Sequence, residues 1–243
     1  GILPPNAAAK VYSNNGSIIM GAVVGEGMLS VISRDASVQS FTDLVGKTVY
    51  VAGQGATPEY MARYIAQKNG VEIGEAVNQI NLSFSIPAAE LAPAIIGKKI
   101  EYALVPEPFA TVATMKDPSI KRVINVQDAF SSVSGEDSYP MTVVVIRSEF
   151  AATYPETVTQ FLSAYKNAIA WTNENPAEAG QLVEKHTLGL TAAIASKAIP
   201  NAAFTFVSAT EARPEVEKLL SLFLEFAPES IGGSLPSDAF YFK

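Results

Sequence analysis

The sequence predicts an α/β protein built from two doubly wound lobes, and three observations support this class. The middle of the chain alternates short β-favouring runs with helical stretches, the order typical of a doubly wound sheet. The last third is nearly all helical, so its helices must cover strands that come from elsewhere in the chain. The 243 residues are 48% hydrophobic and 17% charged, which is enough apolar sequence for a large core in one or two domains.

The N-terminal region begins with the end of a strand at Ile2-Leu3, followed by a Pro4-Pro5-Asn6 loop. A short helix is expected over 7–12, with Asn6 as its candidate N-cap. The apolar run 18–24 predicts a strand buried on both faces, as in a parallel sheet. Glycines interrupt this run at 25–27, and a strand resumes over 28–32.

The segment from Val51 to Gly70 reads as the end of a strand, a tight loop and a helix. Gly53 and Gly55 allow backbone conformations that are closed to other residues. Thr57 is a candidate N-cap with Pro58 in the first helical position. The first amides of this helix favour an anionic or hydrogen-bond-accepting group over the loop, although an ordinary βα turn without a ligand fits as well.

Further elements follow from periodicity, from Gly and Pro breaks and from β-branched runs. Strands are expected over 48–51, 80–85, 100–105, 122–126 and 141–146, and residues 131–139 are expected to form a polar loop. Helices are expected over 88–96, 109–115, 155–172, 177–185, 192–199 and 211–226, and the aromatic residues of 239–242 should fix the tail to the core.

The order of elements predicts a split lobe with a second lobe inserted into it. Since the C-terminal helices lack a sheet, they should return to pack on the N-terminal strands. Lobe 1 is then expected over 1–34 plus 147–243, and lobe 2 over 35–140. The two connecting segments, near 28–35 and 140–147, would form a hinge.

Composition excludes several classes of function. The net charge is −7 and no stretch concentrates Lys or Arg, so nucleic acid is an unlikely partner. The chain has no cysteine, which excludes disulfides, thiolate catalysis and zinc–thiolate sites, and its single histidine, His186, excludes histidine-cluster metal sites. The longest early apolar stretch, 17–25, is too short to span a membrane.

Four loops are expected to face a cleft between the lobes, because ligands of open α/β sheets bind beyond the carboxyl ends of strands. The candidates have alternative roles: Asn6 as an N-cap, Gly27 as a bulge, and Glu107 as a partner for a lysine or a backbone amide. Tyr60 and Tyr64 share a helix face, and we expect them to pack against the protein interior rather than to stack on a ligand. The candidate ligand-binding residues are Asn6, Gly27, Met28, Gln54, Gly55, Ala56, Thr57, Glu107 and Met141.

No catalytic set and no cofactor motif emerges. The chain has no Walker loop, and GQGATP lacks the third glycine of a dinucleotide-binding fingerprint. Acidic residues are scattered, with no pair in local register for acid–base chemistry. We therefore expect no enzyme activity, no metal and no cofactor.

Several stretches in this order resemble the solute-binding proteins of ABC importers of the nitrate/sulfonate/bicarbonate group, which also includes carriers of thiamine-pyrimidine precursors. The longest is DLVGKTVYVAGQGATPEYMARYIAQKNGV, over 43–71. The others are PPNAAAKVY at 4–12, GKKIEYALVPEPFATVA at 97–113, YPMTVVVIRSEFAATYPETV at 139–158 and the ending GGSLPSDAFYFK.

The resemblance implies a type II periplasmic-binding-protein fold, with a ligand held between two lobes that close on it. It implies delivery to a membrane permease and a periplasmic or lipid-anchored cell-surface location. By position, Asn6, Gly27 and Met28 would form one wall of the site, Gln54 to Thr57 and Glu107 the other, and Met141 would lie beside the hinge.

Members of the group normally have a strand and a helix before the PPN-type loop, so we expect lobe 1 to lack these elements here. The ligand is expected to be a sulfonate, another small anion or a pyrimidine, with the acid Glu107 favouring a zwitterion or a neutral ring. An enzyme related to pyrimidine synthases and the effector domain of a transcription regulator remain alternatives.

Overall fold

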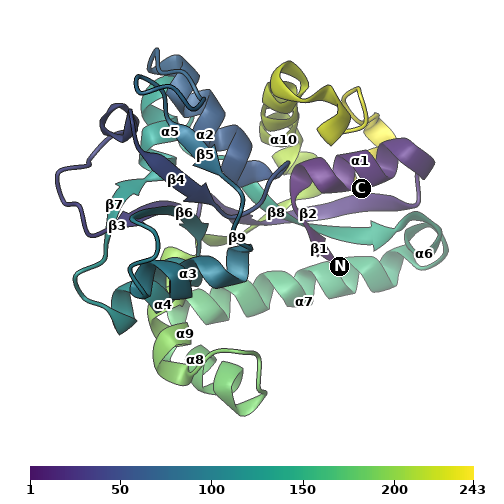
Figure 1. The fold of residues 1–243 in the computed structure, drawn as a ribbon. Coiled ribbons are helices and arrows are strands. Elements are labelled where there is room, and N and C mark those ends of the chain that lie inside the picture. The colour runs from purple at the N-terminus through teal and green to yellow at the C-terminus, as the bar shows by residue number, and fades with distance from the viewer. The chain divides into compact units, whose positions relative to one another are not determined.

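The computed structural model describes all residues, 1–243, and the chain divides into two compact units (Figure 1). Unit 1 contains residues 1–27, 139–175 and 203–243, and unit 2 contains residues 28–138 and 176–202. The chain therefore passes between the units four times, whereas the sequence predicted two connecting segments.

The contact units differ from the expected lobes in three segments, and strand pairing gives the reason. Residues 28–34 lie in unit 2 because Leu29–Ser33 (β3) pairs with two strands of that unit. Residues 140–146 lie in unit 1 because Pro140–Arg147 (β8) pairs with its strands. Residues 176–202 lie in unit 2, where the helix Ala192–Ala198 (α9) packs against Phe109–Lys116 (α4).

Unit 1 is organised around a four-stranded sheet in the order β1-β8-β2-β9. Its other strands are Ile2–Leu3 (β1), Ile18–Glu26 (β2) and Phe204–Ser208 (β9), and each neighbouring pair is antiparallel. The expectation of a parallel neighbour for the 18–24 run was wrong. β2 is apolar because helices cover both faces of its sheet, a pattern that does not depend on strand direction.

Helices cover both faces of the unit 1 sheet (Figure 1). Pro5–Asn15 (α1) and Ala209–Phe226 (α10) pack together on one face, and Pro155–Glu174 (α7) lies along the other beside Ser148–Thr153 (α6). Val158 and Leu162 of α7 are buried against Ala22, Val24 and Val144 of the sheet. The predicted anchoring of the tail is confirmed, because Phe240 is fully buried and the Phe242 N–H donates to the Met20 carbonyl.

Unit 2 contains a five-stranded sheet in the order β5-β4-β6-β3-β7. Thr48–Val51 (β4) runs parallel to Asn81–Ser83 (β5) and to Tyr102–Pro106 (β6), as the βα alternation predicted. β3 is antiparallel to β6 and to Lys121–Asn125 (β7).

The unit 2 sheet also has helices on both faces (Figure 1). Thr57–Lys68 (α2) packs with Val126–Ser134 (α5), and Ala88–Ile96 (α3) packs with α4. Pro176–Lys185 (α8) and Ala192–Ala198 (α9) form a helical hairpin. Short 3-10 helices occupy Phe41–Leu44, Ile199–Asn201, Pro228–Ser230 and Asp238–Phe240.

The helix α5 was not predicted: Val126 was expected to end a strand and residues 131–134 to begin a polar loop, and no element was expected over 127–130. The Asn125 side chain caps it by accepting hydrogen bonds from the amides of Gln127 and Asp128. Val126 and Phe130, four residues apart, are its buried face. An N-cap followed by apolar residues at i and i+4 was the signal that could have identified this helix.

Candidate functional site

Three of the predicted site residues meet at one edge of the unit 1 sheet. Gly27 directly follows β2. Met141 is the second residue of β8, and the residues on either side of it, Pro140 and Thr142, pair with Glu26 and Gly25 of β2. Asn6 lies in the first turn of α1, which begins two residues after β1. Asn6 and Met141 are both buried. Asn6 is not the N-cap of this helix: Pro4 occupies that position and Asn6 lies within the helix.

The other predicted residues meet at one edge of the unit 2 sheet. β4 and β6 are parallel neighbours, and Val51 pairs with Leu104, so the loops that leave these strands start side by side. Met28 precedes β3 at the same edge, where its carbonyl accepts a hydrogen bond from the Glu107 N–H at 3.2 Å. Each unit therefore presents a group of predicted residues at the end of its own sheet.

The loop from Gly53 to Thr57 is held by a buried acid that the sequence analysis missed. Gly53 and Gly55 have φ of 110° and 68°, values that favour glycine. A carboxylate oxygen of Glu59 accepts a hydrogen bond from the Gly55 N–H at 2.7 Å. Arg63, one turn further along α2, donates to the other oxygen through Nε at 2.8 Å. The position of Glu59, an acid in the first turn of the predicted helix, was the sequence signal that could have identified this contact.

The helix α2 begins one residue earlier than predicted. Ala56 is its N-cap, without a side-chain hydrogen bond, and Thr57 is its first residue. Thr57 is fully buried and its hydroxyl has no hydrogen-bond partner in the chain, whereas Gln54 in the preceding loop is exposed. Tyr64 packs against Phe130 with ring centroids 5.7 Å apart, as expected of a packing residue.

Glu107 has internal partners in unit 2. One carboxylate oxygen accepts from the Thr111 N–H at 3.2 Å, and the other accepts from Nε and a terminal nitrogen of Arg122. Arg122 also donates to the Thr111 hydroxyl at 2.7 Å. The Glu107 side chain is only 3% exposed. Glu107 therefore accepts a backbone amide in the first turn of α4, which is one of the alternative roles predicted for it. Its charge is balanced by Arg122 of β7.

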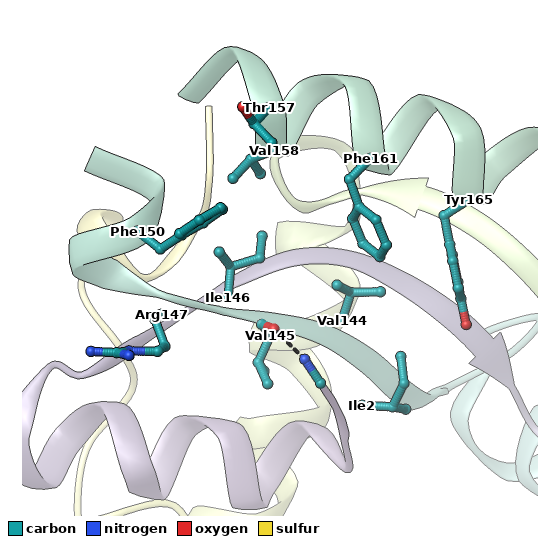
Figure 2. Close-up of a pocket in the computed structure, with 11 residues that line it drawn as sticks. Ile2, Val144, Val145, Ile146, Arg147, Phe150, Thr157, Val158, Phe161 and Tyr165 are labelled. Carbon is teal, nitrogen blue, oxygen red and sulfur yellow. Dashed lines mark hydrogen bonds between the residues drawn. The ribbon is translucent and has the colours of Figure 1, made fainter. Parts of the chain in front are cut away.

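A separate groove on unit 1, with a volume of about 510 Å³, lies between β8 and α7 (Figure 2). Its walls are mainly aliphatic and aromatic, with Phe150 and Phe161 directed toward the groove in Figure 2. Arg147 is its only charged side chain, and it pairs with Glu149. None of the predicted site residues lines this groove, and its few polar groups make it a poor site for a small polar solute.

The chain holds no group of three or more His, Cys, Asp or Glu side chains that could bind a metal ion. None of its helices combines the length and the hydropathy needed to cross a bilayer.

The fold is that of periplasmic binding proteins, as predicted. The chain is similar over its full length to the crystal structure of an ABC transporter from Parabacteroides distasonis, with 23% identity, a TM-score of 0.83 and 80% of that chain covered. It is similar over 96% of its length to the aliphatic sulphonate binding protein SsuA from Escherichia coli, with 13% identity, a TM-score of 0.72 and 77% of that chain covered.

The nitrate-binding protein NrtA from Synechocystis is a third similar structure, with 13% identity and a TM-score of 0.60 over 90% of this chain and 63% of that chain. No curated protein matches the chain. The family model described as NMT1/THI5 like matches residues 19–179, so the chain belongs to the NMT1/THI5-like family. The group suspected from the sequence is thereby confirmed.

Proposed function

We propose that the chain is the solute-binding component of an ABC importer, which captures a small molecule between its two units and passes it to a permease. The observation that carries this proposal is the placement of the predicted residues. Each unit gathers its own group at one edge of its sheet, on loops that leave the strands, as expected for a ligand site of an open α/β sheet.

The similar structures support the proposal. SsuA is named as a sulphonate binding protein and NrtA as a nitrate-binding protein, and both are described as periplasmic. By analogy, the partner would be an ABC permease and the location extracytoplasmic, either in the periplasm or at the cell surface through a lipid anchor. The ligand classes to test are sulfonates, other small anions and pyrimidines.

Within the proposed site, the residues divide into two roles. Asn6, Gly27 and Met141 of unit 1 and the 54–57 loop of unit 2 contact the ligand. Met28 and Glu107 hold the loop between β6 and α4, since they are joined by a hydrogen bond and Glu107 has internal partners.

The proposed function has no catalytic step. The chain has no cysteine, and His186 directly follows the last residue of α8. The family model is described as NMT1/THI5 like, after proteins other than the binding proteins above. The absence of catalysis is therefore tested by incubating the ligand with the protein and measuring the mass of the recovered ligand by mass spectrometry. A changed mass would contradict a function without a catalytic step.

The experiment that tests the binding function combines thermal shift with small-angle X-ray scattering. A ligand at 100 times its Kd should stabilise the protein by about 2.7 kcal/mol, and closure should lower the radius of gyration. Asn6→Ala and Gln54→Ala should each weaken binding at least tenfold. The exposed residues Asn14 and Gln67 provide matched Ala controls. Binding that is unaffected by both site variants would contradict the proposal.

A further inference from the structure

Residues 176–202, here called the strap, belong to unit 2 although both of their ends continue into unit 1. The strap contains the helical hairpin of α8 and α9, which follows α7 and precedes β9. The sequence predicted only two connections between the lobes, so the two that the strap adds were not expected. Because each of its ends is continuous with unit 1, the strap joins the units by two covalent connections.

The base of the strap is fixed at the end of β2. The Glu26 N–H donates to the carbonyl of Ala203, the residue that directly follows the strap, at 3.2 Å. Asn173, near the end of α7, donates through its side-chain amide to the Phe204 carbonyl at 2.9 Å. Phe204 also pairs with β2. The base of the strap is therefore held beside Gly27, one of the proposed ligand-binding residues of unit 1.

The backbone at this base has a conformation that alanine rarely adopts. Ala203 has a φ of 46°, in the left-handed region, which is unfavourable for a residue with a side chain. Such a conformation persists only where the surrounding structure fixes it. The hydrogen bond from Glu26 and the pairing of Phe204 with β2 are the contacts that fix it here. The base is therefore a defined joint and not a loose linker.

The two helices of the strap pack too closely to move separately. Gly180 of α8 is buried. A Cβ atom at this position would lie 2.2 Å from the Ser196 hydroxyl oxygen and 2.6 Å from the Ala192 carbonyl oxygen of α9. The strap is therefore a rigid element, and a displacement of its base is transmitted to its far end.

The far end of the strap lies on α4 of unit 2. The helix α9 packs against α4 and buries Ala195 and Ala198. In the first turns of α4, Ala110 and Thr111 are buried, and the Thr111 N–H donates to the carboxylate of Glu107. The strap thus connects the end of β2 in unit 1 to the helix that follows the Glu107 loop in unit 2.

We propose that the strap couples the two groups of site residues, so that the end of β2 in unit 1 and the first turn of α4 in unit 2 move together when the protein binds its ligand. This inference rests on the proposed function. A ligand that displaces one group displaces the other through the strap, which makes capture by the two units cooperative. The strap moves as one body and keeps its own hydrogen bonds.

The test is amide hydrogen exchange, followed by NMR, on the 243-residue protein without ligand. Asn173→Ala removes a hydrogen bond at the base of the strap, in unit 1. We expect the amides of residues 109–112, in unit 2, to exchange about threefold faster, the effect of losing one hydrogen bond of ordinary strength. Asn175→Ala is the matched control, because the Asn175 side chain donates only to the Trp171 carbonyl of the preceding helix, and it should leave these amides unchanged.

A second variant tests the coupling in the opposite direction. Gly180→Ala, in unit 2, forces α8 away from α9, and we expect the Glu26 amide in unit 1 to exchange about threefold faster as well. Gln181→Ala, at the exposed neighbouring position, is its control. If Gly180→Ala does not fold, Asn173→Ala alone decides the question. Faster exchange confined to the unit that carries the substitution would overturn the coupling and leave the binding function standing, because no ligand is present in this test.

Discussion

At the scale of single residues, the buried acids decide the electrostatics of unit 2. The sequence placed Glu107 at a strand end but gave no indication that Arg122, fifteen residues later, would pair with it. That pairing depends on β7 lying close to α4, which is a tertiary property. Glu59 was overlooked because its i,i+4 partner Arg63 resembles an ordinary surface pair, although the acid itself is buried.

Arg122→Met should destabilise the protein by about 3 kcal/mol, because it leaves the Glu107 carboxylate buried without its charge partner; the low end of the range for broken buried pairs applies because the Arg122 side chain is 30% exposed. Chemical denaturation measures this change. Arg147→Met is the matched control, since the side chains of Arg147 and Glu149 are 78% and 83% exposed, and a loss below about 0.5 kcal/mol is expected there. Glu107→Gln added to Arg122→Met should restore part of the loss; equal losses in the two arginine variants would contradict this account.

Asp35 provides a pH-dependent contribution to stability. Hydrogen bonds from Ser37 and from the Tyr102 hydroxyl lower the pKa of its carboxyl to about 2. Because the folded-state pKa lies below the unfolded value of about 4, the contribution is complete above pH 4 and is lost as the pH falls toward 2. Asp35→Asn should therefore lower Tm more at pH 6 than at pH 2.

At the scale of elements, the sequence predicted the long helices and most strands because their periodicity reflects burial. It could not give strand direction: β2 is apolar whether its neighbours are parallel or antiparallel. It also missed α5, whose serines suggested a loop while its few apolar residues pack against α2. The candidate site was predictable as loops at strand ends, whereas the partners of its acids were not.

Removal of the α5 cap tests this interpretation of the missed helix. Asn125→Ala should cost about 1 kcal/mol, because two amides of the first turn lose their acceptor. Asn125→Asp retains that acceptor and should stay within a few tenths of a kcal/mol of the original protein. Urea denaturation of the three proteins provides the comparison, and an alanine variant as stable as the aspartate variant would show that the cap is unimportant.

At the scale of the whole molecule, the proposal requires one ligand to act on both units. Amide hydrogen exchange should then slow on ligand binding in two separate places, the 53–57 loop of unit 2 and residues 25–27 of unit 1. Protection of one place only would indicate a site within a single unit. The backbone amides of α8 provide the internal control, and their exchange rates should not change on ligand binding.

The division of the two sheets along the chain also sets the order in which they can form during synthesis. All strands of the unit 2 sheet lie between residues 29 and 125, so its pairing can be complete when little more than half of the chain has been made. The unit 1 sheet needs β9, which ends at Ser208. Until then the apolar strand β2 lacks one neighbour, and a nascent chain carries an open sheet edge that invites association with other chains. A chaperone that shields β2 during this interval would therefore increase the yield of folded protein.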